Sequence, residues 1–114
     1  MSENLALPLA GSKKIEASGW VAGERPGELV RPLIDDTAGY RTMLLKVAAG
    51  PLGELHAHDT IEQIYVLDGD FFDDEASYGP GDFVVRMPGT QHRAGSRSGC
   101  TMMVVYAPLA RAAA

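Results

Sequence analysis

The chain has 114 residues and a formal net charge of −5 at neutral pH, with three histidines and one cysteine. This length fits one domain around a single hydrophobic core. The acidic balance, with no basic stripe, gives no electrostatic support for binding nucleic acid or an anionic membrane. We therefore expect a single domain over residues 1–114, with its core at about 28–108 and a peripheral N-terminal segment and alanine-rich tail.

Cys100 is the only cysteine, so a disulfide within the chain is excluded, which fits a reducing compartment. We expect it to be a small buried hydrophobic residue, since a redox role would require a basic neighbour. Residues 1–8 have neither the positive region nor the long apolar run of a signal peptide or membrane span. The expected location is the cytoplasm.

Short apolar runs alternate with turn signals along the chain, and no amphipathic segment of helical length is evident. The expected strands are, in chain order, 29–34 (an edge strand, because Pro32 interrupts it), 41–47, 54–58, 62–67, a return strand that begins at 71–72, 82–86 and 100–106. The acidic stretch 73–75 is expected to be a solvated hairpin tip. Regularly spaced short strands predict an all-β sandwich or barrel.

Two of the three histidines, His56 and His58, occupy alternate positions in the short strand expected at 54–58. Alternate residues of a strand point to the same face, about 7 Å apart along it. Their imidazoles can therefore converge on one metal ion. The alternative is that both are solvated polar residues of a hairpin, because a His-x-His sequence by itself is weak evidence.

A carboxylate and the third histidine complete a candidate metal site. Glu62 opens the next strand and is preferred to Gln63, since counting by twos from Glu62 places Ile64 on the same apolar face. His92 follows a Pro-Gly turn that can deliver it from another strand. Three imidazoles and one carboxylate suit Fe, Mn, Ni, Cu or Zn. Acid–base catalysis by a lone histidine is less favoured, because two histidines on one face would be redundant.

These residues resemble the two sequence motifs of the cupin family. The first motif (Gly, five residues, His, one, His, three, Glu, six, Gly) is matched at every spacing by Gly50, His56, His58, Glu62 and Gly69. The second begins at Gly81 and reaches His92 through Gly89. Met87 and Ser96 depart from it, where the family usually has proline and asparagine, but neither position is a metal ligand in the family.

The resemblance implies a double-stranded β-helix, a jelly-roll-like barrel that is often dimeric. It implies one divalent first-row transition metal held by His56, His58, Glu62 and His92. The segment 65–75 and the later Gly-Cys pair are similar to the cupin domain of ChrR-type anti-sigma factors and to small cupin dioxygenases that cleave diketones and hydroxyacetophenones. The anti-sigma function does not carry over, because those proteins add an N-terminal zinc-binding helical domain for which this chain has no ligand cluster.

Two classes of function follow. As an enzyme, the protein would be an iron-dependent dioxygenase, with Zn, Mn or Ni as alternative metals, acting on a small oxygenated substrate such as a diketone or hydroxyketone. No catalytic base is identifiable, and Tyr65 and Tyr106 are candidates by residue type alone. The alternative is a non-catalytic binding or sensing module with a closed zinc site. No residue favours a metal-assisted isomerase.

The expected partners are a small molecule and a second copy of the chain. A second copy is expected because the edge strand near 29–34 would otherwise be exposed.

Overall fold

The computed structural model describes residues 19–37, 39–52, 56–57 and 59–109, and every regular element within them is a β-strand. None of these residues therefore belongs to a helix that could cross a membrane. Six strands form the largest sheet, in the order β1-β2-β3-β12-β6-β9, and all its pairings are antiparallel. They are β1 (Val21–Ala22), β2 (Leu29–Thr37), β3 (Tyr40–Val47), β12 (Cys100–Ala107), β6 (Ile61–Gly69) and β9 (Phe83–Arg86).

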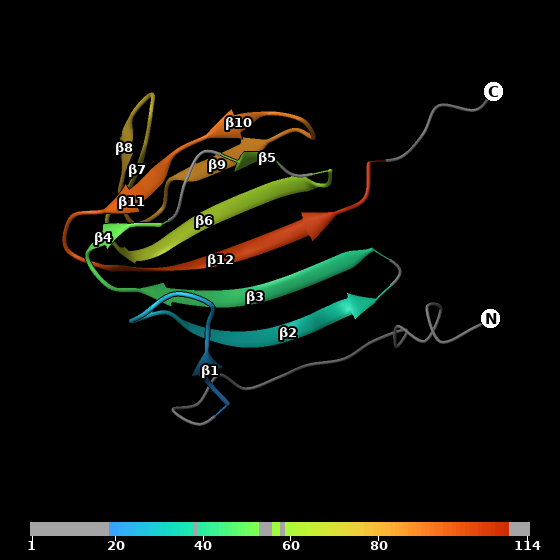
Figure 1. Cartoon of the computed structure of the whole chain (residues 1–114), viewed down its shortest axis with the longest axis horizontal. Coiled ribbons are helices and arrows are strands. Elements are labelled where there is room, and N and C mark those ends of the chain that lie inside the picture. Colours follow the sequence, from blue (N-terminus) through green and yellow to red (C-terminus); the bar gives the residue numbers. More distant parts are fainter. Residues whose placement is uncertain (1–18, 38, 53–55, 58, 110–114) are drawn as a thin grey trace.

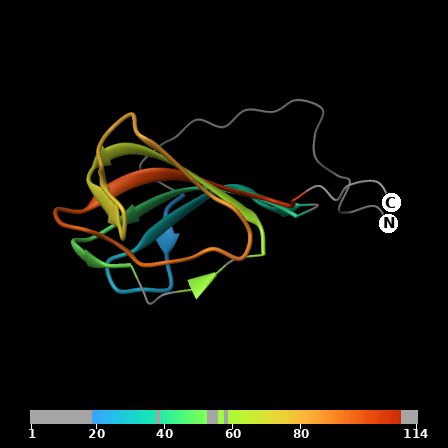
Figure 2. The same cartoon turned by 90° about the horizontal axis from the view of Figure 1, so that it is seen from above.

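Two smaller antiparallel sheets lie opposite the large one. The four-stranded sheet has the order β4 (Gly50–Pro51), β11 (Ala94–Ser96), β7 (Phe71–Asp73), β8 (Ser77–Tyr78). The two-stranded sheet pairs β10 (Gln91–His92) with β5 (His56–Ala57). Figure 1 shows the long strands of the large sheet side by side, and Figure 2 shows the sheets on opposite sides of a common interior. The all-β jelly-roll prediction is thus confirmed.

The long strands follow the sequence prediction closely. The runs 41–47, 62–67, 82–86 and 100–106 form β3, β6, β9 and β12, with ends within two residues of those expected. The run 29–34 forms β2, whose register shifts just after Pro32. β1 pairs only with Leu29 and Val30. Among the described residues, the remainder of β2 therefore has an open edge, as expected.

A strand begins at Phe71 as predicted, but the prediction that it returns beside β6 is wrong. β6 pairs with β12 and β9, whereas β7 lies in the other sheet, paired with β11 and β8. The chain changes sheets at Gly69, which has a φ of +80°. A Cβ at Gly69 would collide with the carbonyl oxygen of Gly99, so this close crossing requires glycine.

The inward positions of the large sheet form rows across the strands, and two of these rows are apolar. One row is Met43, Val104, Ile64 and Val84, and the next is Leu45, Met102 and Val66. Together with Phe71 from the opposite sheet they make the core, in which Val66 is fully buried. Cys100 is also a core residue, and burial raises its pKa to about 11, so it stays a protonated thiol. The prediction of a small buried hydrophobic residue is confirmed.

Candidate metal and substrate site

A third row of inward residues is polar and borders the apolar rows. Arg41, Tyr106, Glu62 and Arg86 are direct cross-strand neighbours on β3, β12, β6 and β9. All four line a cavity of about 860 Å³. The rest of its wall is largely apolar and includes Met43, Leu45, Ile64, Phe71, Met102 and Val104. A few polar groups that converge beside an apolar interior are typical of a small-molecule site.

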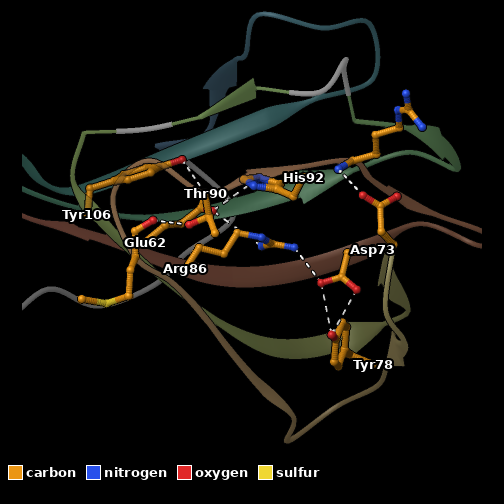
Figure 3. A network of polar contacts seen from close by, with 10 residues as sticks. Glu62, Asp73, Tyr78, Arg86, Thr90, His92 and Tyr106 are labelled. Atoms are coloured by element: carbon orange, nitrogen blue, oxygen red, sulfur yellow. Dashed lines mark hydrogen bonds and ion pairs between the residues drawn. The ribbon is translucent and has the colours of Figure 1, made fainter.

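Glu62 is the centre of this row. The Tyr106 hydroxyl donates a hydrogen bond to Glu62 Oε2 at 2.9 Å. Glu62 Oε1 lies 3.6 Å from Arg86 Nη1 and 3.8 Å from His92 Nε2. Figure 3 shows these side chains meeting around the carboxylate. Tyr106 on β12 and Arg86 on β9 therefore hold the buried Glu62 carboxylate beside His92 of β10.

Arg86 connects Glu62 to a second carboxylate. Its Nη2 donates to Asp73 Oδ2 at 2.8 Å, and both side chains are less than a tenth exposed. The Tyr78 hydroxyl also contacts both oxygens of Asp73 at 3.1 Å (Figure 3). Glu62, Arg86, Asp73 and Tyr78 thus form one continuous chain of polar contacts between the large sheet and the β7–β8 hairpin.

The position of Asp73 corrects one prediction. Burial by itself raises the pKa of Asp73, but the backbone N–H groups of Glu75 and Ala76, the Tyr78 hydroxyl and Arg86 outweigh it, so the pKa is lowered. The stretch 73–75 is therefore not wholly a solvated tip, because Arg86 holds its first residue inward. Asp74 and Glu75 are exposed, as expected.

The two candidate tyrosines have different environments. Burial raises the pKa of Tyr106, and the adjacent Glu62 carboxylate raises it further, so the phenol remains a hydrogen-bond donor. Tyr65 lies on the outer face of the sheet and is 41% exposed. Only Tyr106 lines the cavity.

The structure brings together two of the four predicted metal ligands, Glu62 and His92, both buried. His92 pairs directly with His56 across β10 and β5. The backbone of His56 is described but its side chain is not, and His58 lies outside the described residues. Among the side chains that the structure describes, no group of three or more His, Cys, Asp or Glu forms a metal-binding cluster.

The donors that are described fit a first-row transition metal. His92 and Glu62 are buried residues, and the imidazole Nε2 lies 3.8 Å from the carboxylate Oε1, so together they provide the mixed N/O ligands that such metals accept. The prediction that Glu62 rather than Gln63 faces inward agrees with this geometry, since Gln63 does not line the cavity.

Sequence reasoning missed Arg41, Asp73 and Arg86. Two of the three carried a usable signal. Arg41 and Arg86 each fall, by twos, on the face of Met43 or Val84, so each is a charged residue at an inward position of an apolar strand. The signal at Asp73 was hidden, because Phe71 and Phe72 are both apolar and so short a strand does not show which face is inward.

The chain is an antiparallel jelly-roll barrel whose cavity is lined by the buried residues Glu62 and His92, and solved structures place this fold among the cupins. The chain belongs to the ChrR cupin-like domain family, whose model matches residues 12–110.

Solved structures share this fold at low sequence identity. An RmlC-like cupin from Shewanella frigidimarina has a TM-score of 0.72 at 16% identity, over 88% of this chain and 93% of that chain. The polyketide cyclase RemF from Streptomyces resistomycificus has a TM-score of 0.66 at 24% identity, over 84% and 79%. The Rhodobacter sphaeroides complex of SigE with the anti-sigma ChrR gives 0.64 at 23% identity, over 76% of this chain and 47% of that chain. This chain thus spans about half the length of that relative. The comparison with curated proteins gives no match.

Proposed function

We propose that the protein binds one divalent first-row transition metal through His56, His58, Glu62 and His92. The buried Glu62–His92 pair supports this proposal. Residues directly opposite each other in an antiparallel pair project to the same face, so the register of β5 and β10 favours His56 as a further ligand beside His92. His58 comes two residues after His56, and alternate residues of a strand share a face, so we include it as a ligand.

The proposal extends to a non-haem, metal-dependent enzyme of the dioxygenase type, with iron as its metal and a small oxygenated compound, such as a diketone or hydroxyketone, as substrate. The observation that carries it is the largely apolar cavity beside Glu62 and His92, since a purely structural metal needs no such space. When bound, the metal supplies Lewis acidity and redox chemistry at positions that the protein leaves open. Tyr106 and Arg86 orient Glu62, and we assign no separate catalytic base.

Membership of the ChrR cupin-like family favours one alternative, a non-catalytic binding or sensing domain with a structural zinc. Metal analysis of the purified protein, followed by oxygen uptake with pentane-2,4-dione, separates the two. Stoichiometric iron or manganese with oxygen uptake supports the enzyme. Stoichiometric four-coordinate zinc without oxygen uptake overturns the enzyme and leaves the alternative.

The ligand assignment has its own test. His58→Ala should lower both metal content and melting temperature, because the metal's binding energy is coupled to folding. Gln63→Ala is the control, since Gln63 lies outside the cavity lining next to the ligand Glu62. Full metal occupancy in His58→Ala would show that the assignment is wrong.

The proposal includes a homodimer in the cytoplasm. Among the described residues, the edge of β2 beyond Val30 is open, and the apolar side chains of Phe83, Val85 and Met87 on and after β9 are exposed; both features support self-association. Light scattering or sedimentation that shows only monomers would refute the dimer.

A further inference from the structure

The two arginines of the polar row, Arg86 and Arg41, have different partners. Glu62 and Asp73 both lie against Arg86, at 3.6 Å and 2.8 Å. Arg41, at the other end of the row, contacts the ring of Tyr106, with its Cζ 5.9 Å from the ring centroid. Within the described part of the chain, no carboxylate forms an ion pair with Arg41.

Another arginine that lines the cavity, Arg25, already has a carboxylate partner. Its Nη1 lies 2.9 Å from Oε2 of the buried Glu28. Of the arginines lining the described cavity (Arg25, Arg41 and Arg86), two therefore hold carboxylates of the protein itself. Among the described side chains that line the cavity, Arg41 is the arginine whose guanidinium no carboxylate holds, and we take it as the group that meets a ligand.

Arg41 is well placed for a ligand that enters from solvent. It is exposed, while the next inward positions along β3, Met43 and Leu45, continue into the apolar part of the cavity. A bound molecule can thus hold a charged group at Arg41 and an apolar body against those side chains. A guanidinium binds a carboxylate through two parallel N–H···O bonds, which neutral oxygen groups cannot match in strength.

We propose that, among diketones and hydroxyketones with an apolar body, the cavity prefers those that also carry a carboxylate, and that Arg41 binds this carboxylate. This inference rests on the proposed function, which makes the cavity a substrate site. It narrows the substrate from an oxygenated compound in general to an oxygenated carboxylate, and it makes Arg41 a specificity-determining residue.

The test is calorimetric titration of the full-length protein, as purified, with benzoate and with benzamide, its neutral analogue of the same shape. Benzoate should bind about tenfold more tightly, as expected for a charge-assisted pair. Arg41→Gln should bring the two affinities together, and Arg41→Lys should keep part of the preference because the charge remains. Arg97→Gln is the matched control, since Arg97 is exposed, lies outside the cavity and carries the same charge.

Three outcomes overturn the inference: benzoate fails to bind at millimolar concentration, benzamide binds equally well, or Arg41→Gln keeps the benzoate preference. Metal content is measured on every sample, so failure of the proposed function is seen separately. A protein that holds no metal but loses its benzoate preference in Arg41→Gln refutes the metal site and leaves the carboxylate site standing. A metal-loaded protein that does not prefer benzoate refutes the carboxylate site and leaves the metal site standing.

Discussion

Glu62 owes its orientation to side chains on three other strands, because Tyr106 donates to one of its oxygens while Arg86 and His92 face the other. A carboxylate held in this way presents a fixed lone pair to a neighbouring cation, and such supporting contacts tune metal affinity. We therefore infer that Tyr106 positions Glu62 for the proposed metal.

Removal of the Tyr106 hydroxyl tests this role. Tyr106→Phe should weaken metal binding by about tenfold or more, because Glu62 loses a donor that orients it. The free energy of unfolding should fall by about 1 kcal/mol. Competitive titration with a metal-binding dye measures the first effect and urea denaturation the second. Tyr65→Phe, on the outer face, should change neither, and unchanged metal affinity in Tyr106→Phe would refute the positioning role.

The carboxylate of Asp70 should make the stability of the fold depend on pH. This carboxylate accepts hydrogen bonds from the Ser98 hydroxyl and from the backbone N–H groups of Arg97 and Ser98, and these lower its pKa from 3.8 to about 2. A lowered native pKa means that the charged form stabilises the fold fully above about pH 4 and that this stabilisation is lost as the pH falls toward about 2. The melting temperature of the wild type should thus fall more steeply over this range than that of Asp70→Asn. Parallel pH profiles would contradict the prediction, and Asp68→Asn, an exposed carboxylate on β6, serves as the control.

At the scale of single side chains, the sequence predicted orientation better than contact. Strict alternation along β6 correctly turned Glu62 and Ile64 inward, because period-two geometry is local. The contact between Asp73 and Arg86 could not be predicted in this way. It joins residues of different sheets, and only the tertiary fold brings those sheets together.

Among the elements, the β7–β8 hairpin is tied to the large sheet by the ion pair of Asp73 with Arg86. Breaking one side of a buried ion pair leaves its partner charge without compensation, which usually costs several kcal/mol. Asp73→Asn should accordingly lower the free energy of unfolding by about 3 kcal/mol in urea denaturation. Asp74→Asn, one residue further along the hairpin and exposed, should shift it by no more than about 0.5 kcal/mol. Equal effects of the two substitutions would show that the ion pair does not hold the hairpin.

The length of a strand decided whether the sequence pattern could predict it. β3, β6 and β12 are eight or nine residues long, and their apolar runs made them evident in the sequence. β1, β4, β8 and β10 have two residues each, too few to show any period. The partner of β7 was missed for another reason: Phe71 and Phe72 fit a return strand beside β6 equally well, and the turn at Gly69 decides between the two sheets.

For the whole molecule, the proposed metal site joins parts of the barrel that are distant in sequence. His56 lies on β5 and His92 on β10, which form a two-stranded sheet that is separate, in the described part of the chain, from the six-stranded sheet carrying Glu62. A metal held by all of them would cross-link the two sheets. Because the unfolded chain does not preserve this arrangement, the binding free energy would add to the stability of the fold.

Metal loading should therefore raise the melting temperature. A free metal concentration a hundredfold above Kd adds about 2.7 kcal/mol, which for a domain of this size corresponds to a rise on the order of 10 °C. Addition of a chelator should reverse the rise in a calorimetric scan. His92→Ala should abolish the response, because it removes a ligand from β10, whereas Arg93→Ala, the exposed neighbour, should retain it. A wild-type melting temperature that does not respond to iron, manganese, nickel or zinc would refute a metal that bridges the two sheets.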